Sequence, residues 1–286
     1  MGLGADVRRA GTLVLLLAGC GRLGPSAAGP VREVADWRGR TVRVPDPPRR
    51  IVSIVPAATE LLFAAGAGAQ VVGVTRYCDH PPEARTRPVV GDLVVDLERV
   101  VALGPDLIVG SSIAPAAAAL ERRGFPVFAV DPRGFEDIAR ALRVLGALTG
   151  HPEEGDRAAE EFLRRVRAVE APPGPTVYFE YSADPLGTTG PESYLGELIR
   201  RAGGRNIFEG GWRMAEWEEV LARDPEVILI AHDRTGALER RAGWRELRAV
   251  RAGRVHGVPK EHYVYPAPRL ALGLEGAARL LHEKNP

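Results

Sequence analysis

Short, continuously apolar runs recur along most of this chain and alternate with segments of helical character. The runs are rich in Val and Ile and hold three to five residues each. Unbroken hydrophobicity, in place of an in-and-out alternation, is typical of parallel strands that helices cover on both faces. We therefore predict an α/β fold with parallel sheets, whose strands occupy residues 51–55, 71–74, 107–109, 127–130, 177–181, 227–231 and 255–258.

Apolar residues at helical spacing fill most of the gaps between these strands. The expected helices cover residues 58–65, 97–103, 114–123, 135–148, 194–202, 217–222, 244–250 and 268–281. The alternation breaks once, where a pattern at 153–169 follows the one at 135–148 without a strand between them. Gly150 and Pro152 separate the two, as a helix stop and a helix start would. We interpret the second pattern as a single long helix that joins two lobes; the alternative is one continuous doubly wound sheet with an extra surface helix.

This interpretation gives two Rossmann-like lobes, at residues 31–150 and 172–286, with a linking helix at 151–171. The two halves share a coarse motif, in which a short helix that opens with an acid precedes a proline–acid pair and then a buried strand. The copies contain Glu98 with Pro105-Asp106 and Glu218 with Pro225-Glu226. We expect two lobes with a similar arrangement of elements.

The N-terminus has the features of a targeting signal. Arg8 and Arg9 precede an apolar stretch, residues 10–18, which is too short to span a bilayer. Leu17-Ala18-Gly19-Cys20 resembles the lipobox of bacterial lipoproteins, which implies a signal peptide at 1–19 and lipid on Cys20. The Gly-, Pro-, Ser- and Ala-rich residues 20–30 would then form a flexible tether. The alternative is an ordinary signal peptide with an accidental cysteine.

Composition excludes several classes of function. The 38 basic and 37 acidic residues leave a net charge of +1, which argues against a nucleic-acid partner. Apart from Cys20 the chain has only Cys78, so no disulfide is expected in the mature protein. The sequence lacks the nucleophile-elbow, phosphate-loop, dinucleotide-loop and zinc-protease motifs, and its six histidines lack metal-ligand spacing. We therefore predict neither an enzyme nor a protein with a resident metal or cofactor.

A polar and aromatic cluster, Arg76-Tyr77-Cys78-Asp79-His80, directly follows the predicted strand at 71–74. Ligands of open α/β sheets bind at the carboxyl ends of the strands, so this cluster is a candidate ligand loop. Tyr77 is its main candidate, while Cys78 is more typical of a small buried hydrophobe. His80 could be a metal ligand or an ordinary polar loop residue.

Several short motifs, in a fixed order, resemble one class of ABC-importer substrate-binding proteins. That class has a rigid helical backbone and carries vitamin B12, haem or iron–siderophores. The matching motifs are Gly39-Arg40-Thr41-Val42-Arg43-Val44-Pro45, Pro48-Arg49-Arg50-Ile51-Val52-Ser53, Pro56-Ala57-Ala58-Thr59-Glu60, Leu97-Glu98, Pro105-Asp106-Leu107-Ile108, Gly203-Gly204-Arg205-Asn206-Ile207-Phe208 and Pro268-Arg269.

Residues 77–83 most resemble the cobalamin-binding branch of that class. The resemblance implies that the ligand faces Tyr77, Asp92, Tyr181, Trp212, Glu261, His262 and Tyr265. Two of these positions depart from the branch, because Asp92 replaces a tryptophan and Tyr265 replaces an arginine. The resemblance also implies that Glu98 and Glu218, one in each lobe, pair with arginines of the permease dimer. For each glutamate alone, the alternative is an acid favoured in the first turn of a helix.

The resemblance implies an extracytoplasmic, lipid-anchored, monomeric solute-binding protein that delivers a corrinoid to an ABC importer. Haem or a ferric siderophore is the alternative ligand within the class, and His262 with Tyr263 could then ligate haem iron. From other classes, a chelatase-like or nitrogenase-like enzyme, or an adhesion domain without a ligand, would share parts of the pattern. Because one helix would span both lobes, we expect little lobe movement on binding.

Overall fold

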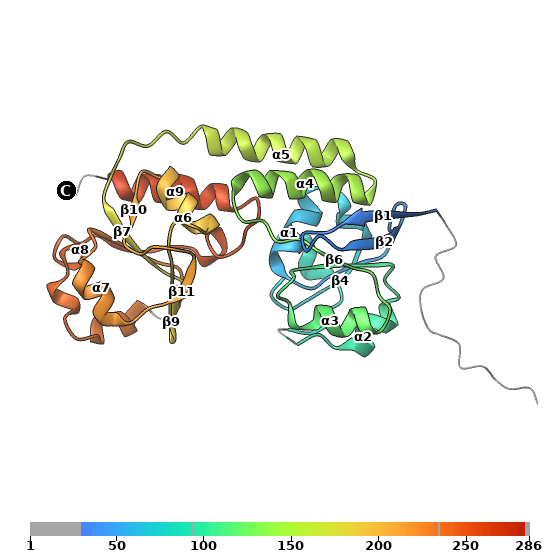
Figure 1. Ribbon diagram of the computed structural model, residues 1–286, viewed down its shortest axis with the longest axis horizontal. Coiled ribbons are helices and arrows are strands. Elements are labelled where there is room, and N and C mark those ends of the chain that lie inside the picture. The colour runs from blue at the N-terminus through green and yellow to red at the C-terminus, as the bar shows by residue number, and fades with distance from the viewer. Residues whose placement is uncertain (1–29, 93, 234, 284–286) are drawn as a thin grey trace, which may run out of the picture.

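The computed structural model describes residues 30–92, 94–233 and 235–283. Figure 1 shows two α/β lobes beside each other, with one long helix running above both. The predicted signal peptide, Cys20 and the tether up to residue 29 lie outside the described residues. Within the part of the chain that the structure describes, no helix has the length and apolarity needed to cross a membrane.

The N-terminal lobe contains a four-stranded parallel sheet in the order β4-β3-β5-β6. Its strands are β3 (Ile51–Ser53), β4 (Val71–Val74), β5 (Leu107–Gly110) and β6 (Val127–Ala129). The surrounding helices and 3-10 turns are α1 (Pro56–Ala64), η1 (Ala67–Gln70), η2 (Pro82–Thr86), α2 (Leu97–Leu103), α3 (Pro115–Arg122) and α4 (Phe135–Thr149). Ile51 belongs to the core on the α1 and α4 side, and Val52 to the core on the α2 and α3 side. Burial on both faces explains why the strand is continuously apolar.

The C-terminal lobe repeats this order, with a parallel sheet β10-β7-β12-β13. Its strands are β7 (Thr176–Glu180), β10 (Arg205–Asn206), β12 (Val227–Ile230) and β13 (Val255–Gly257). The helices and 3-10 turns are α6 (Tyr194–Arg201), α7 (Trp217–Arg223), η3 (Thr235–Arg240), η4 (Trp244–Glu246), α8 (Arg248–Arg251), η5 (Lys260–His262) and α9 (Leu270–His282). In both lobes the first strand lies between the second and the third, so the connections leave it in opposite directions. The structure thus confirms two α/β lobes with parallel sheets, and their arrangement is the same.

The linking helix is α5 (Pro152–Arg167), which turns back at Gly150 and packs along α4 before it continues over α9 (Figure 1). The two helices approach closely where Gly146 faces Gly155, since a Cβ on Gly146 would lie 2.8 Å from the Gly155 Cα atom. Phe162 of α5 also stacks on Phe135 of α4, with ring centroids 5.8 Å apart. The helix ends at Arg167, before the prolines at 172 and 173, and the predicted 151–171 segment finishes with a turn at Ala168 and irregular chain.

Three features of the fold differ from the sequence expectations. A hairpin of β1 (Val31–Ala35) and β2 (Thr41–Pro45) precedes the first sheet. A small antiparallel sheet of β8 (Ser182–Ala183), β9 (Leu186–Thr189) and β11 (Trp212–Met214) adds to the second lobe. The helix expected at 244–250 is instead the turn η4 followed by α8, because Leu247 has an extended backbone.

One hydrophobic core crosses the junction between the lobes. Residues of α1, α4, α6 and α9 form a single buried cluster with α5. The far face of each sheet has a separate cluster of its own. Because the two lobes share packed side chains along α5, moving one lobe relative to the other would disturb a close-packed core. Little lobe movement on binding stays a prediction, and the shared core is the physical reason for it.

Candidate ligand cleft between the lobes

A cavity of about 310 Å³ lies where loops of the two lobes meet. The N-terminal lobe lines it with the segment after β4, and the C-terminal lobe lines it with η5 and the residues before α9. The lining residues are Arg76, Tyr77, Asp79, His80, Arg85, Lys260, Glu261, Tyr265 and Arg269. The structure therefore brings together three predicted ligand residues that are far apart in sequence, namely Tyr77, Glu261 and Tyr265.

In the N-terminal wall of the cavity, Cys78 points into the protein core and its neighbour Tyr77 points outward. The Cys78 side chain is only 2% exposed, and its Sγ lies 3.1 Å from the Oγ1 of Thr75. Burial raises the pKa of this thiol, so it stays protonated. The Arg76 amide donates to the Gly91 carbonyl over 2.8 Å, which holds the loop against the 91–95 segment. With its neighbour turned inward, Tyr77 is exposed at the cavity.

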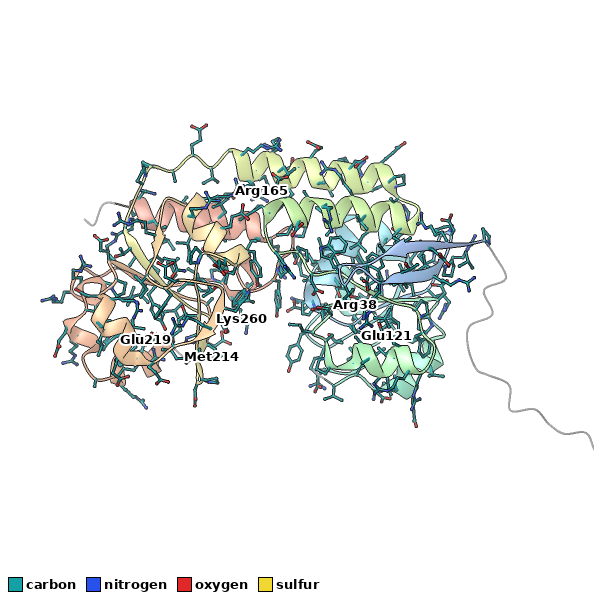
Figure 2. All side chains as sticks on the ribbon, in the orientation of Figure 1. Arg38, Glu121, Arg165, Met214, Glu219 and Lys260 are labelled. Atoms are coloured by element: carbon teal, nitrogen blue, oxygen red, sulfur yellow. The ribbon has the colours of Figure 1, made fainter. Side chains whose placement is uncertain are left out.

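The C-terminal wall is positioned by Tyr263, which is buried and tilts against Phe179 at 5.7 Å between ring centroids. Tyr263 is therefore a core residue and is not available to ligate haem iron. On the exposed side of η5, the Lys260 Nζ lies 3.0 Å from Asp233 Oδ2. That hydrogen bond raises the pKa of Lys260, which keeps the ammonium charged. Figure 2 shows Lys260 on the side of this lobe that faces the other lobe.

Most charges in the cavity already have opposite partners within the protein. Arg85 lies 4.0 Å from Asp79, and Arg269 lies 2.8 Å from Glu60. Arg76 and Glu261 are the exceptions, since neither side chain has a hydrogen bond or ion pair with another described residue. Among the described residues, no group of three or more His, Cys, Asp or Glu could hold a metal ion.

Two lining groups are held in their uncharged forms by burial. Desolvation lowers the pKa of His80, so its ring is neutral near pH 7. Burial likewise raises the pKa of Tyr265, so its hydroxyl remains a hydrogen-bond donor. With its other charges largely paired, the cavity is suited to a polar ligand of low net charge.

An aromatic cluster forms a second surface on the C-terminal lobe. Trp212 of β11 lies edge-on to Tyr181, with centroids 5.2 Å apart, and tilts against Tyr194 at the same distance. Trp212 remains 47% exposed, as does much of Met214, two residues along the same face of the strand. The buried Tyr194 donates from its hydroxyl to the Val264 carbonyl over 2.7 Å, which ties this cluster to the cavity wall.

Asp92 and His262 lie elsewhere than the cavity. Asp92 is exposed in its own loop, where its Oδ1 accepts from the Val94 amide over 3.1 Å, so its short side chain stays in that turn. His262 lines an adjoining cavity of about 970 Å³, which also includes Arg165 of α5 and shares His80 and Arg269 with the first cavity. The 3-10 turn η5 explains this placement, because it directs Glu261 and His262 to different sides.

Glu98 and Glu218 occupy equivalent positions, as the second residues of the seven-residue helices α2 and α7. Asp96 caps α2 and a capping box with Glu216 begins α7. Both helices end at a residue in the left-handed conformation, Gly104 and Asp224. Both glutamates are exposed, and neither carboxylate has a hydrogen bond or ion pair with a described residue.

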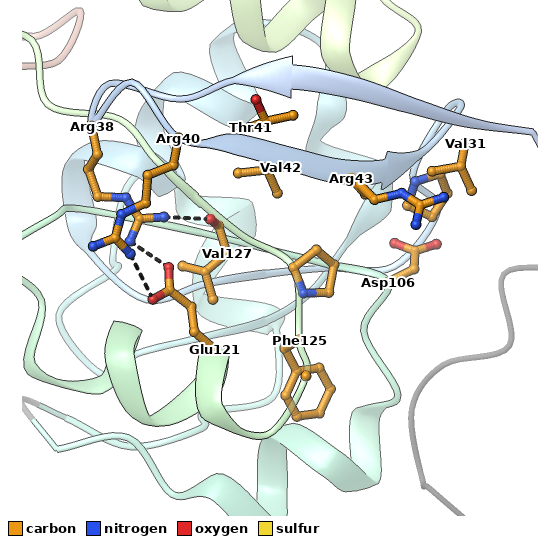
Figure 3. Close-up of a pocket in the computed structure, with 13 residues that line it drawn as sticks. Val31, Arg38, Arg40, Thr41, Val42, Arg43, Asp106, Glu121, Phe125 and Val127 are labelled. Atoms are coloured by element: carbon orange, nitrogen blue, oxygen red, sulfur yellow. Dashed lines mark hydrogen bonds and ion pairs between the residues drawn. The ribbon is translucent and has the colours of Figure 1, made fainter.

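A further cavity, of about 580 Å³, lies in the N-terminal lobe beside the β1–β2 hairpin (Figure 3). Arg38 and Arg40 both pair there with Glu121, and Arg38 also donates to the Val127 carbonyl over 2.9 Å. Its charges thus hold the hairpin on α3 and the start of β6. This cavity is lined by one lobe alone and shares no residue with the cleft.

Sequence reasoning did not find Lys260 and Arg269 as cleft residues, and it named Arg76 only as part of the candidate ligand loop. Lys260 is one of only two lysines in a chain whose other basic residues are arginines, which is a usable signal in retrospect. Arg269 was found only as part of a motif, because nothing local shows that it meets a residue of the other lobe.

Comparisons with known proteins agree with this geometry. The family model described as "Periplasmic binding protein" matches residues 51–262. An uncharacterized ABC transporter substrate-binding lipoprotein of Bacillus subtilis is 27% identical over 94% of this chain and 93% of its own length. The periplasmic vitamin B12 binding protein BtuF of Vibrio cholerae is 27% identical, with a TM-score of 0.72 over 82% of this chain and 97% of that one.

A periplasmic heme binding protein from Pseudomonas aeruginosa is 25% identical, with a TM-score of 0.74 over 84% of this chain and 94% of that one. Proteins of this kind act in transport and are not enzymes. The two-lobe fold, the cavity between the lobes and the similarity to these proteins all indicate the same family. The chain belongs to the periplasmic binding protein family and is an extracytoplasmic substrate-binding protein of the ABC-importer class that carries vitamin B12, haem or siderophores.

Proposed function

We propose that this protein captures a corrinoid between its lobes and delivers it to the permease of an ABC importer. The observation that carries the proposal is that the exposed Trp212 and the half-buried Tyr181 lie on the same lobe as a cavity wall whose charges are largely neutralised. A corrinoid offers a flat ring with a rim of uncharged amides. Aromatic side chains suit the ring, and hydroxyl groups such as that of Tyr265 suit the amides.

Haem and ferric siderophores make a different demand. Both carry anionic groups, which favour unpaired arginine or lysine. In this cleft Arg85, Lys260 and Arg269 already have carboxylate partners, which leaves Arg76 alone for an anion. The balance of charge therefore favours a neutral ligand.

Delivery would use the two equivalent acids. Glu98 and Glu218 are exposed, one on each lobe, and an arginine on each permease subunit could form a bidentate pair with them. Two points of attachment would orient the cleft over the permease. Cys20, by analogy with the lipobox of lipoproteins, would carry the lipid that keeps the protein at the membrane surface.

A titration tests the ligand. The full chain carrying Cys20→Ala, which cannot be lipidated, is titrated with cyanocobalamin, with haemin and with a ferric hydroxamate, followed by absorbance and calorimetry. We expect micromolar or tighter binding of cyanocobalamin alone. Binding of haemin or the ferric chelate with no binding of cyanocobalamin would reject the corrinoid in favour of that ligand.

A further inference from the structure

Helices α1 and α6 are the first helices after the first strand of their lobes' parallel sheets, and each carries a glutamate near its start, as the fifth residue of α1 and the fourth of α6. The two sequences are Thr59-Glu60-Leu61-Leu62 in α1 and Gly196-Glu197-Leu198-Ile199 in α6. The apolar residues after each glutamate are buried in the shared core. Each glutamate, however, finds its main-chain partner in the other lobe.

Glu60 binds the start of α9 in the C-terminal lobe. One carboxylate oxygen accepts from the backbone amide of Arg269 and the other from its Nε, both over 2.8 Å. Arg269 is the N-cap residue of α9, and Glu60 is only 4% exposed. A buried carboxylate with two charge-assisted hydrogen bonds is strongly held in place.

Glu197 binds the start of α4 in the N-terminal lobe. Its Oε2 accepts from the backbone amide of Phe135, the first residue of α4, over 3.0 Å, while its Oε1 pairs with Arg201 at 2.8 Å. The Arg201 guanidinium also lies 5.3 Å from the centre of the Phe135 ring. A Cβ at Gly134 would come within 2.5 Å of the carboxylate, so the bond needs glycine there.

The two contacts therefore form a reciprocal pair. Helices α4 and α9 both begin at the lobe junction and run away from each other (Figure 1). The amides at a helix start have no partner within the helix and carry partial positive charge, which a carboxylate satisfies. Because each carboxylate belongs to the opposite lobe, both caps form together only at one relative position of the lobes.

Both caps are also joined to the walls of the cleft. Arg269 lines the 310 Å³ cavity, and Tyr265 precedes it by four residues. On the other side, α6 begins with Tyr194, whose ring contacts Trp212. We propose that Glu60 and Glu197 are positioning residues, a reciprocal pair of cross-lobe helix caps that fixes the spacing of the cleft walls and so the thickness of ligand that fits between them.

Measurement of the lobe spacing without ligand tests this inference independently of the proposed cargo. Spin labels are placed on α3 and α8 through Arg122→Cys and Arg251→Cys, both exposed, in the full chain with Cys20→Ala. The buried Cys78 would remain unlabelled. Label–label distances are then compared among the parent, Glu60→Gln, Glu197→Ala and the double variant. Glu161→Ala is the matched control, because among the described residues Glu161 pairs only with Arg164 of its own helix.

We expect a wider distance distribution in each single variant, the widest in the double variant, and no change in the control. Amide hydrogen exchange at Phe135 and Arg269 should become about tenfold faster or more, while exchange in β3 and β7 stays as in the parent. Unchanged distances in the double variant, or equal acceleration throughout both sheets, would overturn the inference. If Glu60→Gln does not fold, Arg269→Lys replaces it in the comparison. This variant keeps the positive charge and the backbone amide that Glu60 caps, so it should widen the distance distribution less.

Discussion

Truncation of Trp212 should weaken ligand binding by an amount that the structure allows to be estimated. A tryptophan offers roughly 200 Å² of side-chain surface. Trp212 is 47% exposed, so about 90 Å² remains for a ligand to cover. At about 25 cal/mol per Å², full coverage contributes about 2 kcal/mol, and Trp212→Ala should raise the Kd about 30-fold.

The assay is calorimetric titration of cyanocobalamin into the parent, Trp212→Ala and Trp212→Phe. The phenylalanine keeps much of the ring contact, so its Kd should rise only about threefold. Val31→Ala is the control, because Val31 is exposed on the hairpin and lies away from the cleft. A folded Trp212→Ala variant whose Kd changes by less than about twofold would show that the ligand does not rest on this surface.

Thermal unfolding must accompany that comparison. Trp212 also contacts Tyr181 and Tyr194, and removing it uncovers part of the buried Tyr194 ring. A fall in Tm with no fall in affinity would assign the tryptophan to local packing alone. A fall in affinity at nearly constant Tm is the result that the ligand surface predicts.

Three further predictions concern docking, the linking helix and the thiol. Reversal of Glu98 and Glu218 to Lys should abolish stimulation of the permease while ligand affinity stays constant. The control Glu33→Lys on the hairpin should leave both quantities unchanged. Full stimulation of the permease by the doubly reversed protein would refute the docking role. Phe162→Ala should lower the free energy of unfolding in urea by about 3–5 kcal/mol, because Phe162 is 3% exposed against α4; a loss below about 1 kcal/mol would contradict that packing. In the Cys20→Ala chain, Cys78 should react with a thiol reagent at pH 8 at least about tenfold faster in denaturant than when folded, because burial raises its pKa and hides it; equal rates would contradict its burial.

The fold was readable from sequence wherever burial is complete. Each parallel strand is covered on both faces, so its apolar run stands out without any knowledge of its partners. Gly150 and Pro152 likewise marked the turn between α4 and α5 through local backbone chemistry. The β1–β2 hairpin and the β8–β9–β11 sheet were not predicted, because their strands are short and partly exposed. Their stability depends on pairing with other strands, which a local sequence pattern does not show.

The cleft was only partly readable for the same reason. Tyr77 follows a strand end, which is a positional signal that survives without the structure. Arg269 joins Glu60 across 209 residues, and no local pattern encodes such a contact. Similarly, His262 and Glu261 are neighbours in sequence, yet one turn of η5 places them in different cavities.

Because the two lobes have the same order of strands, each could signal a bound ligand to the permease through an equivalent segment. The segment that presents Tyr77 follows β4 and leads into α2, and the segment that presents Trp212 follows β10 and leads into α7. Only five residues lie between Trp212 and Glu218 along the backbone. A ligand that displaces Trp212 would therefore strain the short stretch of chain that ends at Glu218, the proposed docking residue. Under the proposed function, each lobe would connect a residue of the ligand surface to a docking glutamate through one continuous segment. The permease could then distinguish a loaded protein from an empty one without movement of one lobe relative to the other.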